Sequence, residues 1–582
     1  MKKLFFTILL ILSYLVAQAQ WGNCATEARW INSDNEYFYE YELAQTAEGN
    51  TWFYLSSSYN THYIQLYDST GVATLGDSDL MLISDYPQPM SLPINQSLYV
   101  DRDGNALVVI PDLRYNTDGS DLTTFSVYKI SQKGEFLWGK EGVALNKGAN
   151  TYINGFLGIT QMSDGSYVFT WLHSDETETI FTIDLQRVSA DGKLLWDVND
   201  TRIADPEGKI MYFWPYVVDA GNNQCILVYT KGSNYDLYAR KLDFDGTAVW
   251  SEDTRIYRGG FLLIPLWTVL DVEPSGDGGV IITWYDDRYF EDTESIYMTY
   301  VKSNGELGFA AGEEGQKLSY SGYRALSTSC KYDPASDTFI ALWREATHGQ
   351  GGYRIVAQSV SKVGELLWGE EGLEVETFDE REYSNLQLEY GHEGEMLAFY
   401  MKSNTLEYGN IDVRMQRIDT KKGALVWSES KVLTDTLSPT HKTDLKVTTM
   451  QHCNSGAFGW DDRGITSDPD YKRLYLQRVN YDGTVGNPTD AGVEEVCQSD
   501  MRFYSTSAIV NNEAIFAVEM SAVAEAVLTI YDVNGAVVAT PFDGVLQAGK
   551  QYVEWRADVP AGVYVATLTT TQGVSTVKVL VK

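Results

Sequence analysis

A glycine in a tight turn recurs at a nearly constant interval along most of this chain, and no other feature constrains its fold as strongly. Each glycine follows a β-like run and precedes an apolar pair, often with a tryptophan, as in RVSADGKLLW (187–196) and KLDFDGTAVW (241–250). The intervals run from 54 to 63 residues, between Gly71, Gly134, Gly192, Gly246, Gly305, Gly364, Gly423 and Gly483. This regularity predicts one structural unit repeated eight times.

A second element, a turn followed by a strongly apolar run, occurs once for each turn glycine. DGSYVFTW (164–171) and DGGVIITW (277–284) are two copies. β-Branched and aromatic residues bounded by Gly, Asp and Asn are typical of strands and tight turns. Each period therefore holds about four short strands, the content of one propeller blade. We expect an all-β chain with an eight-bladed β-propeller over residues 20–498; seven or nine blades are the alternatives.

Aromatic residues close most of these apolar runs, and we expect them to pack between blades, because large aromatics mostly serve core burial. They are Trp171, Tyr229, Trp284, Trp343, Tyr400 and Trp460. The first repeat lacks the tryptophan, but a segment opening with Trp21-Gly22 resembles WGKEG (138–142) and WGEEG (368–372). We expect this segment to add an outer strand to the last blade and so close the ring.

The N-terminal residues are typical of a secretory signal peptide. Met1-Lys2-Lys3 precedes an apolar run from Leu4 to Val16 and an A-x-A site at residues 17–19. A run this short predicts a signal peptide over 1–19 rather than a membrane anchor, which is the alternative. No other segment has the length and apolarity of a membrane span. We therefore expect a secreted or cell-surface protein that passes through the periplasm.

The formal net charge is −36. A field of this sign repels nucleic acid and anionic membrane surfaces, which excludes both as expected partners. The five cysteines do not form a disulfide scaffold, and no C-x-x-C pair suggests zinc. Cys24 and Cys497 bracket the repeats, so a disulfide between them could tie the ring closed in an oxidising compartment. The alternative is that all five are free thiols.

After Cys497 the repeats stop, and a linker over 499–504 is expected to lead into a small β-sandwich-like domain over 505–582. AVLTIYDVNGAVVA (526–539) is a hairpin with Asn-Gly at its tip. VPAGVYVATLT (559–569) and STVKVLVK (575–582) follow it. These segments resemble the type A C-terminal sorting domain of the Bacteroidetes type IX secretion system. The matching positions are Ile530, Tyr531, Asp532, Gly535, Ala561, Gly562, Val563, Tyr564, Lys578 and Lys582.

The resemblance implies that this domain directs the chain to the type IX secretion machinery, which would be its partner. One departure is that SAIVNNEAIFAV (507–518) lacks the Pro-Asn-Pro segment with which such domains usually begin. The alternative is an ordinary accessory β-domain.

No catalytic residue is predicted, because the chain has no G-x-S-x-G elbow, phosphate-binding Gly-Lys-Ser/Thr loop or H-E-x-x-H pair. The turn-and-tryptophan element, notably Asp191-Gly192-Lys193 with Trp196, resembles the tryptophan-docking repeats of quinoprotein dehydrogenases. Those enzymes usually carry adjacent cysteines at the cofactor, and no two cysteines are adjacent here. We interpret the similarity as shared blade structure.

The candidate ligand-binding residues form an acidic-basic pattern that follows the second strand of a repeat. Asp286-Asp287-Arg288 follows Trp284, and Asp461-Asp462-Arg463 follows Trp460. These carboxylates could hold calcium or a sugar hydroxyl, with the aromatics stacking on a ring. The alternative is a turn-capping aspartate whose arginine bridges to the next blade. No complete calcium site or other metal site is evident, and no other cofactor is predicted.

We therefore expect a non-catalytic propeller that binds a protein or glycan. The alternatives are an extracellular hydrolase or lyase acting on polysaccharide, and a structural or assembly component of the cell envelope.

Overall fold

A computed structural model describes most of the chain. The described residues are 21, 28–31, 38–57, 61–75, 80–84, 86, 97–114, 123–146, 152–153, 158–174, 179–258, 270–286, 294–349, 351–403, 411–434, 440–451, 453–463, 473–486, 501–505, 509–510, 513–520, 523–533, 535–547, 549–570 and 573–581. The expected signal peptide, Cys24 and Cys497 lie outside these residues. The chain divides into two compact units, and the second consists chiefly of Asn487–Lys582.

Within the described residues, the first unit holds eight antiparallel sheets, numbered here in chain order. The first sheet contains β2 (Phe38–Gln45), β3 (Thr51–Ser57), β4 (His62–Tyr67) and β5 (Met81–Ser84), and the second contains β6 (Leu98–Val100), β7 (Ala106–Asp112), β8 (Thr124–Ile130) and β9 (Val143–Ala144). The third contains β10 (Tyr152–Ile153), β11 (Gly158–Gln161), β12 (Tyr167–Ser174) and β13 (Phe181–Val188), and α2 (Val198–Thr201) follows it. The fourth contains β14 (Tyr212–Asp219), β15 (Cys225–Lys231), β16 (Asp236–Leu242) and β17 (Thr254–Tyr257).

The other four sheets have the same layout. The fifth sheet contains β18 (Asp271–Pro274), β19 (Val280–Asp286), β20 (Ser295–Val301) and β21 (Gln316–Lys317), with the short η2 (Gly312–Glu314), and the sixth contains β22 (Arg324–Asp333), β23 (Thr338–Ala346), β24 (Tyr353–Val360) and β25 (Leu373–Asp379). The seventh contains β26 (Tyr383–Tyr390), β27 (Glu395–Ser403), β28 (Ile411–Asp419), β29 (Ala424–Leu425) and β30 (Lys431–Val432). The eighth contains β31 (Lys442–Val447), β32 (Ser455–Asp462) and β33 (Arg473–Asn480), joined by β1 (Arg29–Trp30). The all-β prediction is confirmed.

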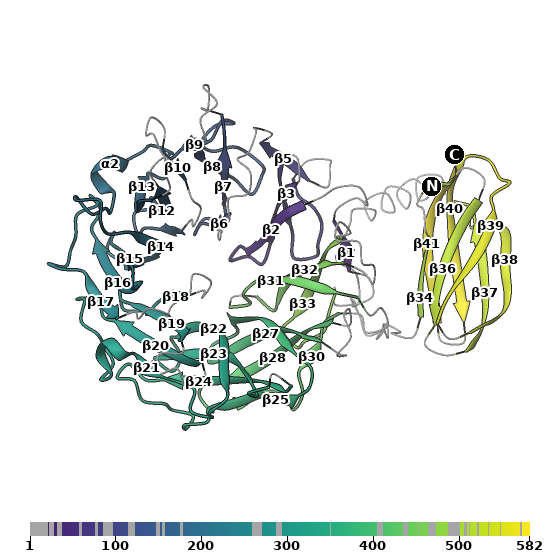
Figure 1. The fold of residues 1–582 in the computed structure, drawn as a ribbon. Coiled ribbons are helices and arrows are strands. Elements are labelled where there is room, and N and C mark those ends of the chain that lie inside the picture. Colours follow the sequence, from purple (N-terminus) through teal and green to yellow (C-terminus); the bar gives the residue numbers. More distant parts are fainter. Residues whose placement is uncertain are drawn as a thin grey trace, which may run out of the picture. The chain divides into compact units, whose positions relative to one another are not determined.

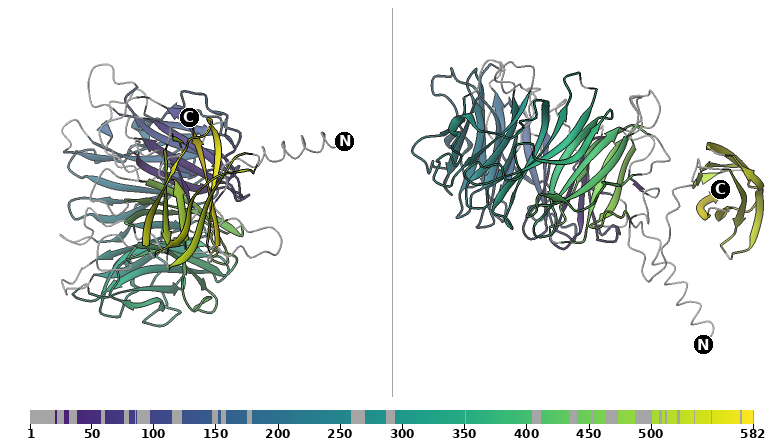
Figure 2. Two further views of the ribbon diagram at one scale, coloured as in Figure 1. Left: turned by 90° about the vertical axis from the view of Figure 1, so that its right-hand side faces the viewer. Right: turned by 90° about the horizontal axis from the view of Figure 1, so that it is seen from below.

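The sheets follow one another around a ring, with strands such as β6, β14, β18, β22 and β31 nearest its centre (Figure 1). Strands of neighbouring sheets stand side by side when the ring is seen from below (Figure 2). One hydrophobic cluster joins the fourth sheet to the fifth and another joins the fifth to the sixth. The aromatics that close the second strands are buried in this unit, as predicted. This is the arrangement of a β-propeller.

The recurring glycine turns lock successive sheets together. All eight turn glycines have positive φ, which glycine adopts at little cost. The tryptophan of one repeat covers the turn of the next: a Cβ at Gly192 would lie 2.8 Å from Cγ of Trp138. The indole N–H of Trp138 donates to the carbonyl of Ala190 at 3.0 Å, and Trp196 makes the same bond to Phe244. Each repeat thus docks onto its successor.

The segment before the first repeat completes the eighth sheet. Strand β1 pairs antiparallel with β33, through Arg29 opposite Leu476 and Trp30 opposite Tyr475. Trp21 is buried, and its backbone N–H donates to the carbonyl of Thr70 at 3.1 Å, beside the turn glycine Gly71. Trp21 therefore covers the turn glycine of the first sheet in the way that Trp138 covers the turn glycine of the third sheet.

The second unit contains two sheets that share one hydrophobic core. A three-stranded sheet contains β34 (Met501–Ser505), β36 (Glu513–Met520) and β39 (Gly549–Arg556). A five-stranded sheet contains, in spatial order, β35 (Ile509–Val510), β41 (Gly573–Val581), β40 (Gly562–Thr570), β37 (Ala524–Tyr531) and β38 (Val537–Leu546). Because β34 pairs with β36, this unit begins before Ser505, and most of the expected linker 499–504 is a strand.

Candidate functional site

The acidic residues singled out from the sequence lie where second strands end. Asp286 is the last residue of β19, and Asp461 and Asp462 are the last residues of β32. All three are buried, and Arg463 lies 3.7 Å from Asp461 as an ion pair. Asp287 and Arg288 lie outside the described residues.

The tryptophans beside these acids are part of the core. Trp284 is fully buried and donates its indole N–H to Asp286 at 2.8 Å. Trp460 is buried with its ring centroid 5.4 Å from those of Phe458 and Tyr475. Neither tryptophan offers a face on which a sugar could stack, so the idea that they stack on a ligand is not supported by their burial. Trp284 instead fixes the carboxylate from which the next loop starts.

The same aromatic-to-carboxylate contact recurs in other sheets with different residues. Trp343 donates to Glu345 at 3.0 Å, and Glu345 pairs with Arg354 at 2.7 Å. Tyr229 donates to Asp253, which pairs with Arg240. The recurrence favours the structural alternative weighed above, in which the acid and its arginine hold the turn.

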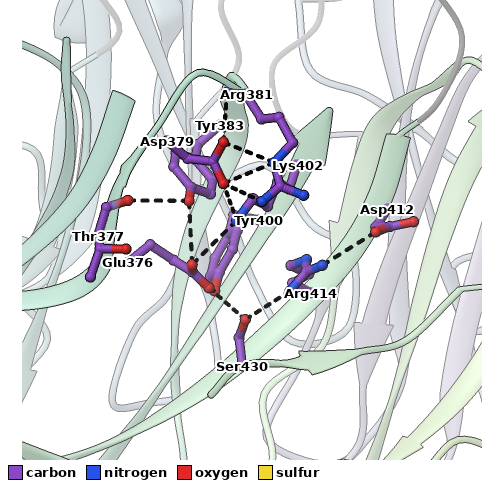
Figure 3. Close-up of polar contacts among 10 residues, drawn as sticks. All are labelled: Glu376, Thr377, Asp379, Arg381, Tyr383, Tyr400, Lys402, Asp412, Arg414 and Ser430. Carbon is purple, nitrogen blue, oxygen red and sulfur yellow. Dashed lines mark hydrogen bonds and ion pairs between the residues drawn. The ribbon is translucent and has the colours of Figure 1, made fainter. Parts of the chain in front are cut away.

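A polar network of this kind joins the sixth and seventh sheets (Figure 3). Nζ of Lys402, at the end of β27, lies 3.2 Å from Asp379 and 3.6 Å from Glu376, both of β25. Ser430 donates to Glu376 at 2.5 Å, and Tyr400 donates to it as well. The side chain of Lys402 is only 7% exposed, so its charge is balanced inside the protein and not by solvent.

The two carboxylates of this network are held in their charged form. The hydrogen bonds of Arg381 keep the pKa of Asp379 far below its ordinary value. Burial alone would raise the pKa of Glu376, but the hydrogen bonds from Ser430 and Tyr400 and the charge of Lys402 lower it. Neither carboxyl can act as a proton donor near neutral pH, as a glycosidase acid must. The network is suited to holding loops in place.

Carboxyl groups whose pKa is raised and not lowered lie on the innermost strands. Burial raises the pKa of Glu40, on β2, to about 7. Burial likewise raises the pKa of Glu273 on β18 and of Glu389 on β26, against the charge of Lys331 on β22. Lys331 contacts Glu273 directly. No role for these residues was predicted from the sequence, although Glu273, Lys331 and Glu389 stand 58 residues apart and occupy one position of the repeat.

The innermost strands also carry a repeated distortion. Register shifts interrupt the pairing of β14, β22, β26 and β31 with their neighbours. A residue other than glycine with positive φ lies in each: Trp214, Ser327, Asn385 and Asp444. β-Bulges of this kind re-aim side chains and end pairing at a rim, often beside a binding site.

The described residues contain no group of three or more His, Cys, Asp or Glu side chains placed to hold a metal ion. Cys225 and Cys330 are buried free thiols, and Cys453 is a half-buried one. None of the helices in the described part of the chain has the length and apolarity of a membrane span.

The sorting-motif positions of the second unit divide into two groups. Asp532 and Gly535 form the turn of the β37–β38 hairpin, and Tyr564 is buried with its hydroxyl donating to Pro560 at 2.8 Å. Gly562 is half-buried and opens β40. Tyr531 is half-buried and Lys578 is exposed. Asp532, Gly535 and Tyr564 thus stabilise the fold, whereas the side chains of Tyr531 and Lys578 make no hydrogen bond or ion pair with the described residues.

No protein-family model matches the chain, and no curated protein sequence matches it. Among solved structures, the endo-arabinase of Bacteroides thetaiotaomicron is 11% identical, with 48% of this chain and 95% of that chain covered and a TM-score of 0.28. The acylaminoacyl peptidase of Pyrococcus horikoshii is 9% identical, over 76% of this chain and 60% of that one, with a TM-score of 0.36. The Dos1 propeller is 8% identical over 69% and 93%, with a TM-score of 0.30.

Proposed function

We propose that this protein is an exported, eight-bladed propeller that binds a protein or glycan through the loops between second and third strands. The observation that supports the proposal is the repeated locking of the residues from which these loops start. Trp284 fixes Asp286, Trp343 fixes Glu345, and the network around Lys402 fixes the end of β27. A binding surface assembled from short loops needs such a rigid mount.

The amino-acid content of these loops supports the same proposal. Residues 115–122 (YNTDGSDL), 287–293 (DRYFEDT), 404–410 (NTLEYGN) and 464–472 (GITSDPDYK) each contain a tyrosine among short polar and acidic residues. Tyrosine gives a large amphipathic contact at low entropic cost, while Asn, Asp, Ser and Thr supply adaptable hydrogen bonds. This mixture suits recognition of glycans and protein surfaces.

A glycan array probed with the mature chain, together with an assay for released reducing sugar, tests the binding function. We expect binding without turnover, and loss of binding in a Tyr289→Ala, Tyr471→Ala double variant. Tyr320→Ala is the matched control, because Tyr320 is 46% exposed and lies in the segment that follows β21, away from these loops in the sequence. A protein ligand should be captured by the immobilised wild-type chain and not by the double variant. If the array shows no glycan binding and no such protein is captured either, the proposal is wrong.

A polysaccharide hydrolase or lyase is the second candidate, favoured by the innermost carboxyls. A group with a pKa near 7, such as Glu40, can serve as a general acid. Release of reducing sugar that is abolished in Glu40→Gln or Glu273→Gln would establish this activity and replace the binding proposal. If the chain neither binds a ligand nor releases sugar and is retained in the cell envelope, it would instead fit a structural component.

The export route is part of the proposal. We propose cleavage of a signal peptide after Ala19, followed by passage through the type IX secretion machinery directed by the second unit, which forms a β-sandwich. A chain ending at Gly486 keeps the propeller and lacks all strands of the second unit. We expect it to accumulate in the periplasm while the full chain reaches the surface or the medium. Normal surface appearance of the shortened chain would contradict the route.

A further inference from the structure

Three ionisable residues occupy one position of the repeat on neighbouring innermost strands, and are named here the axial row. Glu273 lies on β18, Lys331 on β22 and Glu389 on β26. Each one pairs with the residue that stands three positions before the aromatic closing the second strand of its sheet. In the fourth sheet the same position is held by the apolar Val218. The order acid, base, acid therefore belongs to the fifth, sixth and seventh sheets.

The members of the axial row interact across the borders between sheets. Nζ of Lys331 binds the carboxylate of Glu273. Glu389 lies close enough that its charge and the charge of Lys331 act on each other. The side chain of Lys331 is only 14% exposed and that of Glu273 22%. Solvent can exchange protons with groups of this kind but screens their charges much less than it screens charges on the surface.

The axial row contains one acid more than it contains bases. A further acid, Asp271, accepts a hydrogen bond from the backbone N–H of Cys330 at 2.6 Å, which stabilises its charge. Glu273 and Glu389 are left to share Lys331, and two carboxylates beside one cation leave a poorly solvated charge without a counterion. Burial accordingly raises the pKa of both glutamates. One of the two carboxyls therefore keeps a proton near neutral pH.

The other described groups that face the row keep their charge state near neutral pH. Burial raises the pKa of the Cys330 thiol and of the Tyr390 and Tyr216 hydroxyls, so all three stay neutral. Burial by itself would lower the pKa of Lys331, but the carboxylates around it raise that pKa on balance, and the lysine stays charged. The change of charge near neutral pH therefore falls on the two glutamates.

The innermost strands depend on side chains for their contact with one another. In the described residues, β18, β22 and β26 belong to three different sheets and share no backbone ladder. They are joined by bonds such as that from the backbone N–H of Leu388 to Ser329. Register shifts interrupt β22 between Leu326 and Ser329 and β26 between Ser384 and Gln387. In both strands the part that carries the row is thus separated from the strand's beginning by a break in the ladder.

We infer that the axial row is a pH-sensitive switch that holds the innermost strands of the fifth, sixth and seventh sheets together. With one proton on Glu273 or Glu389, the row is neutral and the strands stay in contact. As the pH rises, this proton passes to water and the second carboxylate becomes charged. Repulsion between two carboxylates beside one lysine then loosens the strands. The switch does not depend on which ligand the loops bind.

The direction of the pH effect follows from the raised pKa. Closed strands favour the protonated carboxyl, because burial raises the pKa of Glu273 above its ordinary value of 4.5. The contribution of this proton to closure is complete below pH 4.5 and is lost as the pH rises through the raised pKa. Ordinary surface carboxyls lose their protons at much lower pH, so they add nothing to a change between pH 6.5 and pH 8.5.

The thiol of Cys330 provides a local measurement of the opening. Cys330 lies on β22 next to Lys331, is fully buried, and has its Sγ 3.9 Å from the carbonyl oxygen of Asp271 on β18. Cys225 on β15 of the fourth sheet is a free thiol that is buried to the same degree. Loss of stability of the whole propeller, including the part due to Glu40, exposes both thiols alike. The ratio of their labelling rates therefore reports on the axial row.

The test treats the purified full chain with a thiol reagent at pH 6.5 and pH 8.5 and follows both cysteines by peptide mass spectrometry. Taking the ratio removes the effect of pH on thiol reactivity. We expect the labelling rate of Cys330 relative to Cys225 to rise about tenfold or more between the two pH values, because a pKa difference of one unit between closed and open strands corresponds to a factor of ten.

Two substitutions of the same shape remove the surplus acid. Glu389→Gln and, separately, Glu273→Gln leave one carboxylate beside Lys331, so the ratio should be the same at both pH values. Glu306→Gln is the matched control, because Glu306 is 69% exposed in the turn after β20 of the fifth sheet and should leave the rise unchanged. Thermal unfolding at pH 6.5 shows which variants fold, and either glutamine variant of the row suffices if the other does not.

A ratio that stays constant between pH 6.5 and pH 8.5 in the wild-type chain would overturn the inference. A rise that persists in the folded glutamine variants would overturn it as well, because the responsible charge would then lie outside the axial row. Neither measurement involves a ligand, so failure of the switch leaves the proposed binding function to be decided by its own test.

Discussion

At the scale of single residues, the turn glycines do two things at once. They supply the positive φ that the turn requires, and they leave room for the tryptophan of the preceding repeat. Gly192 shows both, because its φ is +86° and the ring of Trp138 occupies the space that a Cβ would need. Gly139 has nearly the same φ, +85°, but no atom within 4 Å of the site of a Cβ. Comparing Gly192 with Gly139 therefore separates the need for positive φ from the need for room beside the tryptophan.

We predict that Gly192→Ala destabilises the propeller more than Gly139→Ala. Left-handed backbone costs an alanine about 1–2 kcal/mol in both variants. Only Gly192→Ala also displaces a packed ring, which adds about 1–3 kcal/mol. The midpoint of denaturant unfolding measures the difference. Equal midpoints for the two variants would mean that the tryptophan does not lock the turn.

A second residue-scale prediction concerns pH. The pKa of Glu40 is about 7 in the folded chain, above its ordinary value of 4.5. The protonated side chain therefore favours folding: its contribution is fully present below pH 4.5 and is lost as the pH rises through 7. We expect Glu40→Gln to stabilise the chain at pH 8 by about 1–3 kcal/mol and to leave it nearly unchanged at pH 4.

The matched variant for this measurement is Glu42→Gln. Burial raises the pKa of Glu42 as well, but Glu42 accepts a hydrogen bond from Nζ of Lys446 at 2.9 Å, so its replacement removes the direct partner of that lysine. We expect Glu42→Gln to destabilise the chain at pH 8, the opposite sign to Glu40→Gln. Thermal unfolding at the two pH values reports both signs.

At the scale of strands, the innermost edges are satisfied by side chains of the preceding sheet. Asp271 accepts a hydrogen bond from the backbone N–H of Cys330 at 2.6 Å, and Ser329 accepts one from Leu388 at 3.3 Å. Both contacts span 59 residues, about one repeat. An unpaired strand edge is a template for aggregation, and these contacts cover it. The repeat therefore fixes the chemistry of the edge as well as its position.

The network around Lys402 gives a prediction for the seam between the sixth and seventh sheets. Lys402→Met leaves Glu376 and Asp379 without their shared cation, and removing one partner of a buried ion pair costs about 3–5 kcal/mol. The loss should shrink at pH 4, where Glu376, buried and no longer beside Lys402, can take up a proton, while the hydrogen bonds of Arg381 keep Asp379 charged. Lys422→Met is the control, because Lys422 is 78% exposed in its pair with Asp419. A loss of stability that does not change with pH would contradict this account.

The closing contact of the ring gives a prediction at the same scale. Trp21→Ala removes a buried ring that packs against Tyr67. We expect a loss of about 3–5 kcal/mol. We also expect faster hydrogen exchange in β33, to which the adjoining β1 is paired, than in β16, which lies in the middle of its sheet. Uniform exchange across both strands would contradict a role in closure.

At the scale of the whole molecule, the chain consists of two units that each have a core of their own. The eighteen buried residues of the second unit's cluster all lie between Phe503 and Val581. We predict two separate transitions in calorimetry of the full chain. The chain ending at Gly486 should keep the transition of the propeller at an unchanged temperature. A single transition, or a shifted one in the shortened chain, would show that the units depend on one another.

The sequence was most informative where one physical requirement recurs. The glycine interval predicts a repeated sheet, because glycine alone fits the turn at little cost, and Trp21-Gly22 predicts the closing segment by its likeness to WGKEG. The candidate ligand residues were harder to interpret. The pair Trp284 and Asp286 has the same sequence signature whether the tryptophan faces a ligand or holds the acid, and only its burial separates the two. The importance of Glu40 was not predictable, since its pKa depends on burial that the composition of β2 does not reveal.

Because β1 completes the sheet that contains β33, residues made before the first repeat must wait for residues made in the last one. During synthesis or passage through a pore, therefore, the growing chain has no complete ring to fold into, and β1 has no partner until β33 has been made. Intermediates that end early should be substrates for proteases and holding chaperones, whatever the stability of the finished molecule.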